Sequence, residues 1–237
     1  MRALLKIFLF CIGLVAFLLV TAFAWIFLYS RGLPDTSALA RFAPAATTSF
    51  SDPCLKAASV AIPYESVGGN LRSAFSAVEV AESDPGLFTT MYERFTGKGR
   101  LQRATLSVQI SRTMFCEPSK SLNRHLDEIR TAVQLERHFS RAELFTIYAN
   151  RAYFADNLIG VQATSQYFFH KNPDELSLAE AALLAGLPKA PAFYSPIKHP
   201  DRALQRRNDV IDAMLQVPSV NTLQAASAKM TGLGIAR

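Results

Sequence analysis

The stretch from Arg124 to Asn150 constrains the fold most, because it carries two amphipathic helical patterns separated by a short break. At 100° per residue, the first pattern separates a polar arc from an apolar arc that contains Leu135 and Phe139. Glu128 projects between those two residues, so a helix that buries them must partly bury a carboxylate. Ser140 opens a capping box that predicts the start of the second helix.

Two interpretations of Glu128 stay open on these grounds. Arg124 lies one turn earlier and can neutralise the carboxylate in a purely structural ion pair. Alternatively, the carboxylate belongs to a functional site. An unpaired buried carboxylate costs several kcal/mol or shifts its pKa upward, so a partner for Glu128 is expected in either case.

The N-terminus carries an apolar run from Ile7 to Tyr29, preceded by Arg2 and Lys6. A bilayer-spanning helix needs about 20 such residues. A cleaved signal peptide would have a shorter apolar region and a small-x-small cleavage site, which this segment lacks. We therefore predict an uncleaved transmembrane anchor in residues 1–31, with a cytoplasmic N-terminus because basic residues precede it.

The remaining chain divides by composition into a linker, one domain and a tail. Residues 32–69 are rich in Pro, Ser, Ala and Thr and are predicted to form a linker. Residues 70–216 suit one domain with its own core, and residues 217–237 form a C-terminal tail. No alternating pattern is long enough to predict a major sheet. The predicted fold class is therefore mainly α.

The formal charge is +6, from 25 Lys and Arg against 19 Asp and Glu. Most of the excess lies between Tyr92 and Arg151, where the sequence contains eleven basic and six acidic residues. A basic surface next to a membrane anchor suits anionic head groups or a diphosphate. The anchor and the lack of a nucleic-acid-binding motif argue against nucleic acid as a partner.

The chain has three cysteines, of which Cys11 lies in the apolar run. No Cys-x-x-Cys or His-rich pattern predicts a structural metal site. Cys54 and Cys116 could form a disulfide if the domain lies outside the cytoplasm. Such a bond would close a loop of about 60 residues and could stabilise the fold by roughly 4 kcal/mol.

Three successive segments carry a resemblance to a known family. They read RHLDE at 124–128, LERHFSR at 135–141 and LFTIYAN at 144–150. In this order and spacing they resemble the third and fourth motifs of the peptidoglycan glycosyltransferases, glycosyltransferase family 51, which polymerise lipid II. Residues 153–171 are similar to the fifth motif, with Ala155, Asn157 and His170 in place of glycines, and residues 183–208 are family-like in ways that we interpret as packing and loop features.

The first two motifs of that family match less completely. Residues 74–79 match the first motif up to its catalytic glutamate, which falls on Glu79, but Val80 replaces the following acid. Residues 105–115 resemble the second motif, whereas residues 102–104 read Gln-Arg-Ala where the family has two glycines and a serine. A helix is predicted to begin at Asn70 and to end before Pro85.

The resemblance implies a two-lobed lysozyme-like domain that transfers a sugar from a lipid diphosphate. Glu79 would be the general base, and Glu128 would position cations or hold a divalent metal ion, Mg²⁺ or Mn²⁺. The residues expected to bind substrate are Thr105, Gln109, Arg112, Lys120 and Arg124. The implied partners are lipid II, the growing glycan strand, the membrane and other cell-wall synthesis proteins.

Two other function classes stay open. The altered first and second motifs suit a catalytically inert relative that acts as an envelope scaffold or binds a partner. A muramidase-like hydrolase is the third class, because one acidic residue in a lysozyme-like cleft can also cleave glycan. The products formed from lipid II and from preformed glycan separate the three.

Overall fold

The computed structural model describes residues 12–22, 35–44, 48–52, 57–78, 106–115, 122–154, 156, 158–216 and 220–236. The chain divides into two compact units, Met1–Pro34 and Asp35–Arg237. The elements of the second unit are η2 (Thr36–Phe42), β1 (Thr48–Asp52), β2 (Ala57–Ala61), η3 (Tyr64–Val67), α2 (Gly69–Val78), α4 (Leu106–Met114), α5 (Leu122–His138), α6 (Arg141–Arg151), α7 (Val161–Phe169), η4 (Pro173–Glu175), α8 (Leu178–Gly186), η5 (Leu187–Lys189), α9 (Pro200–Met214) and α10 (Thr222–Met230).

In the first unit, residues 12–22 form a helix. Among the described residues, no helix combines the length and the apolar character that a membrane crossing requires. The anchor predicted from Ile7 to Tyr29 extends beyond the described helix at both ends, so it stays a prediction. Cys11, Cys54 and Cys116 also lie outside the described residues, and the disulfide stays a prediction as well.

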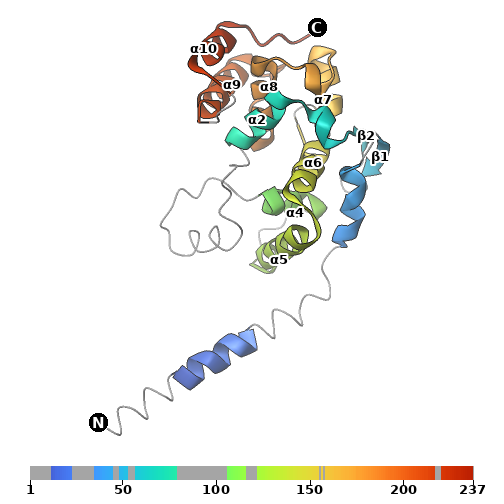
Figure 1. Ribbon diagram of the computed structural model, residues 1–237, viewed down its shortest axis with the longest axis vertical. Coiled ribbons are helices and arrows are strands. Elements are labelled where there is room, and N and C mark those ends of the chain that lie inside the picture. Colours follow the sequence, from blue (N-terminus) through green and yellow to red (C-terminus); the bar gives the residue numbers. More distant parts are fainter. Residues whose placement is uncertain are drawn as a thin grey trace, which may run out of the picture. The chain divides into compact units, whose positions relative to one another are not determined.

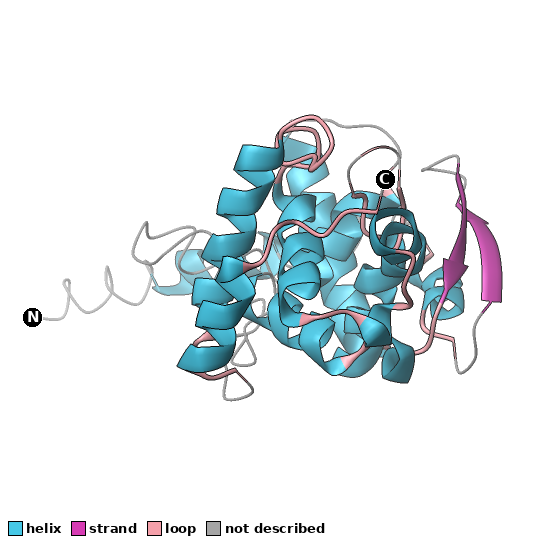
Figure 2. Ribbon diagram, turned by 90° about the horizontal axis from the view of Figure 1, so that it is seen from above, coloured by secondary structure: helices cyan, strands magenta, loops and turns pink. Residues whose placement is uncertain are grey.

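The second unit is mainly helical, which confirms the predicted class. Its named strands are β1 and β2, which pair antiparallel from Thr48 opposite Ala61 to Asp52 opposite Ala57. Figure 2 shows this hairpin at the edge of the helical body. No named strand in the described part of the chain continues the sheet beyond these two.

The helices of the second unit form two packing groups, visible in Figure 1. In one group, α8 packs against α2, α9 and α10, and in the other α4 packs against α5 and α6. Helix α8 has a nearly all-apolar sequence, LAEAALLAG, and its residues from Ala181 to Gly186 are buried. Gly186 allows close approach, because a Cβ there would lie 3.0 Å from Arg206 Cγ on α9.

The helix pair predicted between Arg124 and Asn150 is confirmed as α5 and α6. The capping box is also present: the Ser140 Oγ accepts from the Glu143 amide at 3.3 Å, and the Ser140 amide donates to the Glu143 carboxylate at 2.7 Å. A second box begins at Ser177 and opens α8. These caps satisfy N–H groups that a helix start otherwise leaves without partners.

Helix α2 buries Leu71, Ala74 and Phe75 on one face. The Phe75 ring meets the rings of Phe145 and Tyr148 edge-on, with centroids 5.9 and 5.7 Å apart. Such edge-to-face pairs add stabilisation beyond buried area. The contact ties the two packing groups together, because α2 belongs to the first and α6 to the second.

Part of the predicted linker, residues 32–69, is folded into the second unit. It contains η2, the hairpin and η3, and five of its described side chains are at most 2% exposed. These five side chains are Leu39, Phe42, Ala61, Ile62 and Val67. The composition gave no helical or alternating period, and the ordering arises from contacts with α6.

Asn150, near the end of α6, makes those contacts and is fully buried. Its carboxamide nitrogen donates to the Phe42 and Ile62 carbonyls, both at 2.8 Å. Its carboxamide oxygen accepts from the Ile62 amide at 3.0 Å. One side chain therefore satisfies three buried backbone groups of the N-terminal segment, as buried polar groups require.

Part of the predicted tail, residues 217–237, is folded as well. It includes α10, which buries Ala225 and Ala228. Arg207 on α9 is 1% exposed and donates to three backbone carbonyls of this segment. The acceptors are the carbonyls of Lys229 at 3.1 Å and of Thr231 and Gly232 at 2.8 Å each. Burial lowers the pKa of Arg207.

Replacing Asn150 by leucine should destabilise the domain by about 3 kcal/mol or more, because three buried backbone groups would lose their partners. Denaturant unfolding measures the change. The control is Asn221→Leu at the exposed N-cap of α10, which should cost about 1 kcal/mol. Equal effects of the two substitutions would contradict the structural role given to Asn150.

A second prediction concerns Glu180, which accepts from Lys171 Nζ at 2.8 and 3.0 Å. Burial raises the pKa of Glu180, but hydrogen bonds from Lys171 and Ser177 outweigh it, so the pKa lies below 4.5. A lowered folded-state pKa stabilises above the unfolded-state pKa, and this stabilisation is lost as the pH falls through the folded-state value.

Glu180→Gln should therefore cost about 1 kcal/mol at pH 7, and the difference from the unmodified protein should shrink as the pH falls below 4.5. Thermal unfolding across pH measures this. Glu175→Gln is the matched control, because Glu175 completes a capping box on η4 and has no cationic partner among the described residues. A pH-independent cost for Glu180→Gln would show that its charge is irrelevant.

Candidate active site

Four of the seven predicted site residues lie in the described part of the chain: Gln109, Arg112, Arg124 and Glu128. The other three lie outside the described residues: Glu79, Thr105 and Lys120. The four described residues come from two neighbouring helices, α4 and α5, which pack against each other. The structure therefore brings together residues of the second and third motifs.

Glu128 is 8% exposed and lies between two guanidinium groups. Arg124 Nε, one turn earlier on α5, lies 3.0 Å from Glu128 Oε1. Arg112 Nε, from α4, lies 3.5 Å from Glu128 Oε2. The expected Arg124 pair is thus present, and Arg112 adds a second cation that links the two helices. A single carboxylate between two guanidinium groups leaves a local charge of about +1.

The two arginines differ in exposure. The Arg124 side chain is 13% exposed, and its guanidinium carbon lies 3.7 Å from the centroid of the Phe115 ring. This cation–π contact and the ion pair hold it in place. The Arg112 side chain is 46% exposed. Arg112 is therefore the cation of this group that a ligand can reach.

Helix α4 is docked onto α5 by two further contacts. The Ser107 hydroxyl donates to Glu136 Oε1 at 2.7 Å. Val108 is 7% exposed and packs with Ala132 in a small apolar cluster. In the second motif that residues 105–115 resemble, a glutamine occupies the position of Val108, which makes a buried apolar contact here.

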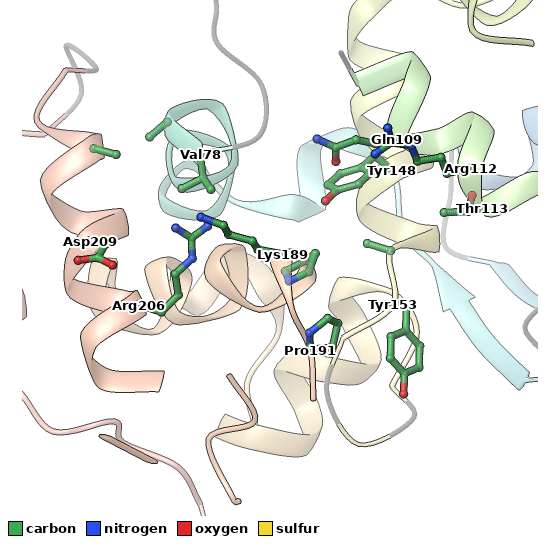
Figure 3. A pocket seen from close by; sticks show the side chains of 14 residues that line it. Val78, Gln109, Arg112, Thr113, Tyr148, Tyr153, Lys189, Pro191, Arg206 and Asp209 are labelled. Atoms are coloured by element: carbon green, nitrogen blue, oxygen red, sulfur yellow. The ribbon is translucent and has the colours of Figure 1, made fainter. Parts of the chain in front are cut away.

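A cavity of about 610 Å³ lies between the two packing groups (Figure 3). It is lined by residues of α2, α4, α6 and the segment after it, η5 and its C-terminal loop, and α9. The lining residues are Ala77, Val78, Gln109, Arg112, Thr113, Tyr148, Ala152, Tyr153, Pro188, Lys189, Pro191, Arg206, Asp209 and Ala213.

Among the described residues, the cavity lining carries three basic side chains and one acidic one. Figure 3 shows Lys189 and Arg206 on the opposite side of the cavity from Gln109 and Arg112. Arg206 Nε donates to the Gly186 carbonyl at 3.2 Å. Within the described chain, no carboxylate lies within ion-pair distance of Lys189 or Arg206. The lining is therefore suited to an anionic ligand.

Several lining residues were not predicted as site residues. Lys189 and Arg206 lie in segments that the sequence suggested were packing and loop features, and Tyr148 and Tyr153 lie within or next to the fourth motif. A signal that could have identified Lys189 is its charge. It follows Pro188 directly after the buried, Ala/Leu-rich helix α8, where core packing does not require a cation. The spacing alone did not show that this loop faces α4.

The surroundings of Glu128 do not fit a divalent cation. Two guanidinium groups already neutralise the carboxylate, and they would repel a metal ion. In the described part of the chain, no group of three or more His, Cys, Asp or Glu side chains could hold a metal. Mg²⁺ and Mn²⁺ are held in proteins mainly by oxygen ligands such as carboxylates. We derive no step through a metal ion.

The geometry supports recognition of an anion in this cavity. Val78, the last described residue of α2 before Glu79, lines the cavity together with Gln109 and Arg112. A leaving group that departs with negative charge is stabilised by cations already in place. An amide such as that of Gln109 can accept from sugar hydroxyls or donate to phosphate oxygens.

Comparisons with known proteins identify the family of the chain. Residues 61–215 match the sequence model of the family described as transglycosylase. The chain is 43% identical over 113 residues to penicillin-binding protein 1A of Aquifex aeolicus, covering 48% of this chain and 16% of the relative. It is 35% identical over 132 residues to penicillin-binding protein 1F of Bacillus subtilis, covering 56% of this chain and 18% of the relative.

The chain is also similar to penicillin-binding protein 1A of Escherichia coli, at 36% identity over 121 residues, covering 51% of this chain and 14% of the relative. The crystal structure of penicillin-binding protein 1A from Haemophilus influenzae aligns at 24% identity with a TM-score of 0.38, over 55% of this chain and 16% of that one. The chain thus spans less than a fifth of the length of these relatives. The family match covers well over half of the chain, and the chain belongs to the peptidoglycan transglycosylases, glycosyltransferase family 51.

Proposed function

We propose that this transglycosylase polymerises lipid II into glycan strands, with loss of undecaprenyl diphosphate. The observation that carries the proposal is the cavity in which, among the described residues, Arg112, Lys189 and Arg206 outnumber the one carboxylate, Asp209. A diphosphate is the anionic group of a lipid-linked sugar donor, and its departure is the step that cations facilitate. The two packing groups of helices suit the two lobes expected for a lysozyme-like domain.

In the proposed reaction, the 4-hydroxyl of one lipid II molecule attacks C1 of the sugar on the growing chain. Glu79 accepts the hydroxyl proton as the new C–O bond forms, because a neutral hydroxyl is a poor nucleophile. The bond from C1 to the diphosphate oxygen breaks, and its electron pair leaves with the lipid diphosphate. Attack opposite the leaving group inverts the configuration at C1.

The described residues have distinct roles in this scheme. Arg112 neutralises the leaving diphosphate. Gln109, on the same helix, binds oxygens of the sugar or the phosphate. Glu128 holds Arg112 from behind through the 3.5 Å ion pair. Arg124 holds Glu128 in place through the 3.0 Å ion pair. Thr105 and Lys120 stay proposed substrate contacts on the strength of their motif positions.

The proposed location follows from the substrate. We propose that residues 7–29 cross the cytoplasmic membrane once and that the domain lies on its outer side, where it meets lipid-linked donors. The basic surplus between Tyr92 and Arg151 would then face anionic head groups. Other cell-wall synthesis proteins are the protein partners that this location favours.

An inert envelope scaffold is the second candidate function. Val108 supports it, because a buried valine cannot supply the hydrogen bonds of the glutamine that the family has at this position. The altered residues 102–104 point the same way. Purified lipid II and preformed glycan distinguish the classes: polymer indicates a transferase, no product indicates a scaffold, and fragments of preformed glycan indicate a hydrolase.

Glu79→Gln should lower the polymerisation rate by roughly 10²–10⁴-fold, because the amide keeps the shape but cannot accept the proton. The rate is measured as glycan formed from lipid II. The control is Glu65→Gln, an exposed glutamate on η3, which should retain the rate of the unmodified protein. A Glu79→Gln variant that polymerises normally would remove Glu79 from the mechanism.

Glu128→Gln should lower both stability and rate, because two guanidinium groups would face each other without a carboxylate between them. We expect a loss of about 2 kcal/mol, since Arg112 is partly exposed, and at least about a tenfold lower rate. Asp127→Asn, next to it on α5 and more exposed, is the matched control and should change the rate little. A loss of stability with an unchanged rate would support the purely structural interpretation of Glu128.

A further inference from the structure

Arg151, the last residue of α6, makes a contact that the proposed mechanism does not use. The residue is 5% exposed. Its Nη2 donates to the Thr113 carbonyl at 2.8 Å, across a sequence separation of 38 residues. A buried guanidinium thus joins α6 to the last turn of α4.

The position of that carbonyl gives the contact its importance. The last four carbonyls of an α-helix have no partner within the helix, and a cation at this end is favourable. Thr113 directly follows Arg112 and lines the cavity. The Thr113 hydroxyl donates to the Ile110 carbonyl at 2.7 Å, which is a contact within α4. Arg151 contacts the same turn from a different helix, α6.

Arg151 is itself firmly held. Its guanidinium carbon lies 5.2 Å from the centroid of the Phe42 ring, and Phe42 is fully buried. Asn150, the preceding residue, donates to the Phe42 carbonyl at 2.8 Å. The guanidinium group is therefore attached to a well-packed part of the core. A residue that positions a catalytic side chain needs such a fixed base.

We propose that Arg151 is a positioning residue for the transfer reaction, and this inference rests on the proposed function. Arg151 fixes the last turn of α4, so that the Arg112 guanidinium faces the cavity and stays within reach of Glu128. The Arg112–Glu128 ion pair is long, at 3.5 Å, so a small shift of this turn would break it. A misplacement of about 1 Å can cost two orders of magnitude in rate.

The test compares three substitutions. Arg151→Met keeps the length and apolar stem but removes every donor, and Arg151→Lys keeps the charge and one donor group. Arg137→Met, at an exposed arginine on α5, is the control for loss of a cation. We expect kcat to fall about tenfold in Arg151→Met with a smaller change in KM, and to recover most of the way in Arg151→Lys. Arg137→Met should keep the rate of the unmodified protein.

A double-mutant cycle separates positioning from general destabilisation. In an Arg112→Met background, Arg151→Met should reduce the rate by less than about twofold, because its effect passes through Arg112. A merely structural role would reduce the rate by the same factor in both backgrounds, and that result would overturn the proposal. If Arg151→Met does not fold, Arg151→Gln takes its place in the cycle.

Amide hydrogen exchange provides a readout that does not depend on turnover. The amides in the last turn of α4 should exchange at least about tenfold faster in Arg151→Met, and should be unaffected in Arg137→Met. If the unmodified protein makes no polymer, the proposed function fails while exchange still tests whether Arg151 fixes this turn. Unchanged exchange in Arg151→Met would overturn the proposal whatever the activity.

Discussion

The N-terminal part of the second unit depends on the buried carboxamide of Asn150. It satisfies backbone groups that lie 88 and 108 residues earlier in the chain. Leaving any of these groups buried and without a partner would cost 1–3 kcal/mol or so each. Through this contact the segment around Phe42 and Ile62 becomes part of the core. Helix α6 is therefore the element against which both the N-terminal segment and, through Arg151, the α4 helix are fixed.

The cations of the site are of two kinds: one is fixed by contacts with neighbouring side chains, and the others line the cavity. Arg124 contacts Glu128 and the Phe115 ring, and its charge stabilises the structure. Arg112, Lys189 and Arg206 line the cavity from different elements, and among the described residues of that lining the acid is Asp209. Packing one carboxylate between two guanidinium groups thus keeps one cation rigid while leaving another exposed. The result is a basic surface whose geometry is set by the core.

Elements with local signals could be predicted from the sequence, and elements ordered by distant contacts could not. The α5–α6 pair carries periodicity and a capping box, and the structure confirms both. The segment around Phe42 and the helix α10 depend on single polar side chains, Asn150 and Arg207, whose partners no local pattern reveals. Gln109 and Arg112 could be predicted as site residues from their motif positions, and both line the cavity. Lys189 also lines it, but the direction of η5 depends on the fold and could not be predicted.

The C-terminal segment is attached through Arg207, whose guanidinium contacts neutral oxygens among the described residues: three backbone carbonyls and the Asn208 side chain. Detaching α10 would strip a buried cation of those oxygens before water could replace all of them, and such a state is costly. A partly unfolded form that loses only α10 is therefore disfavoured. The segment should open together with α9, so that the end of the chain shares the cooperativity of the helices around α8 and does not fray independently.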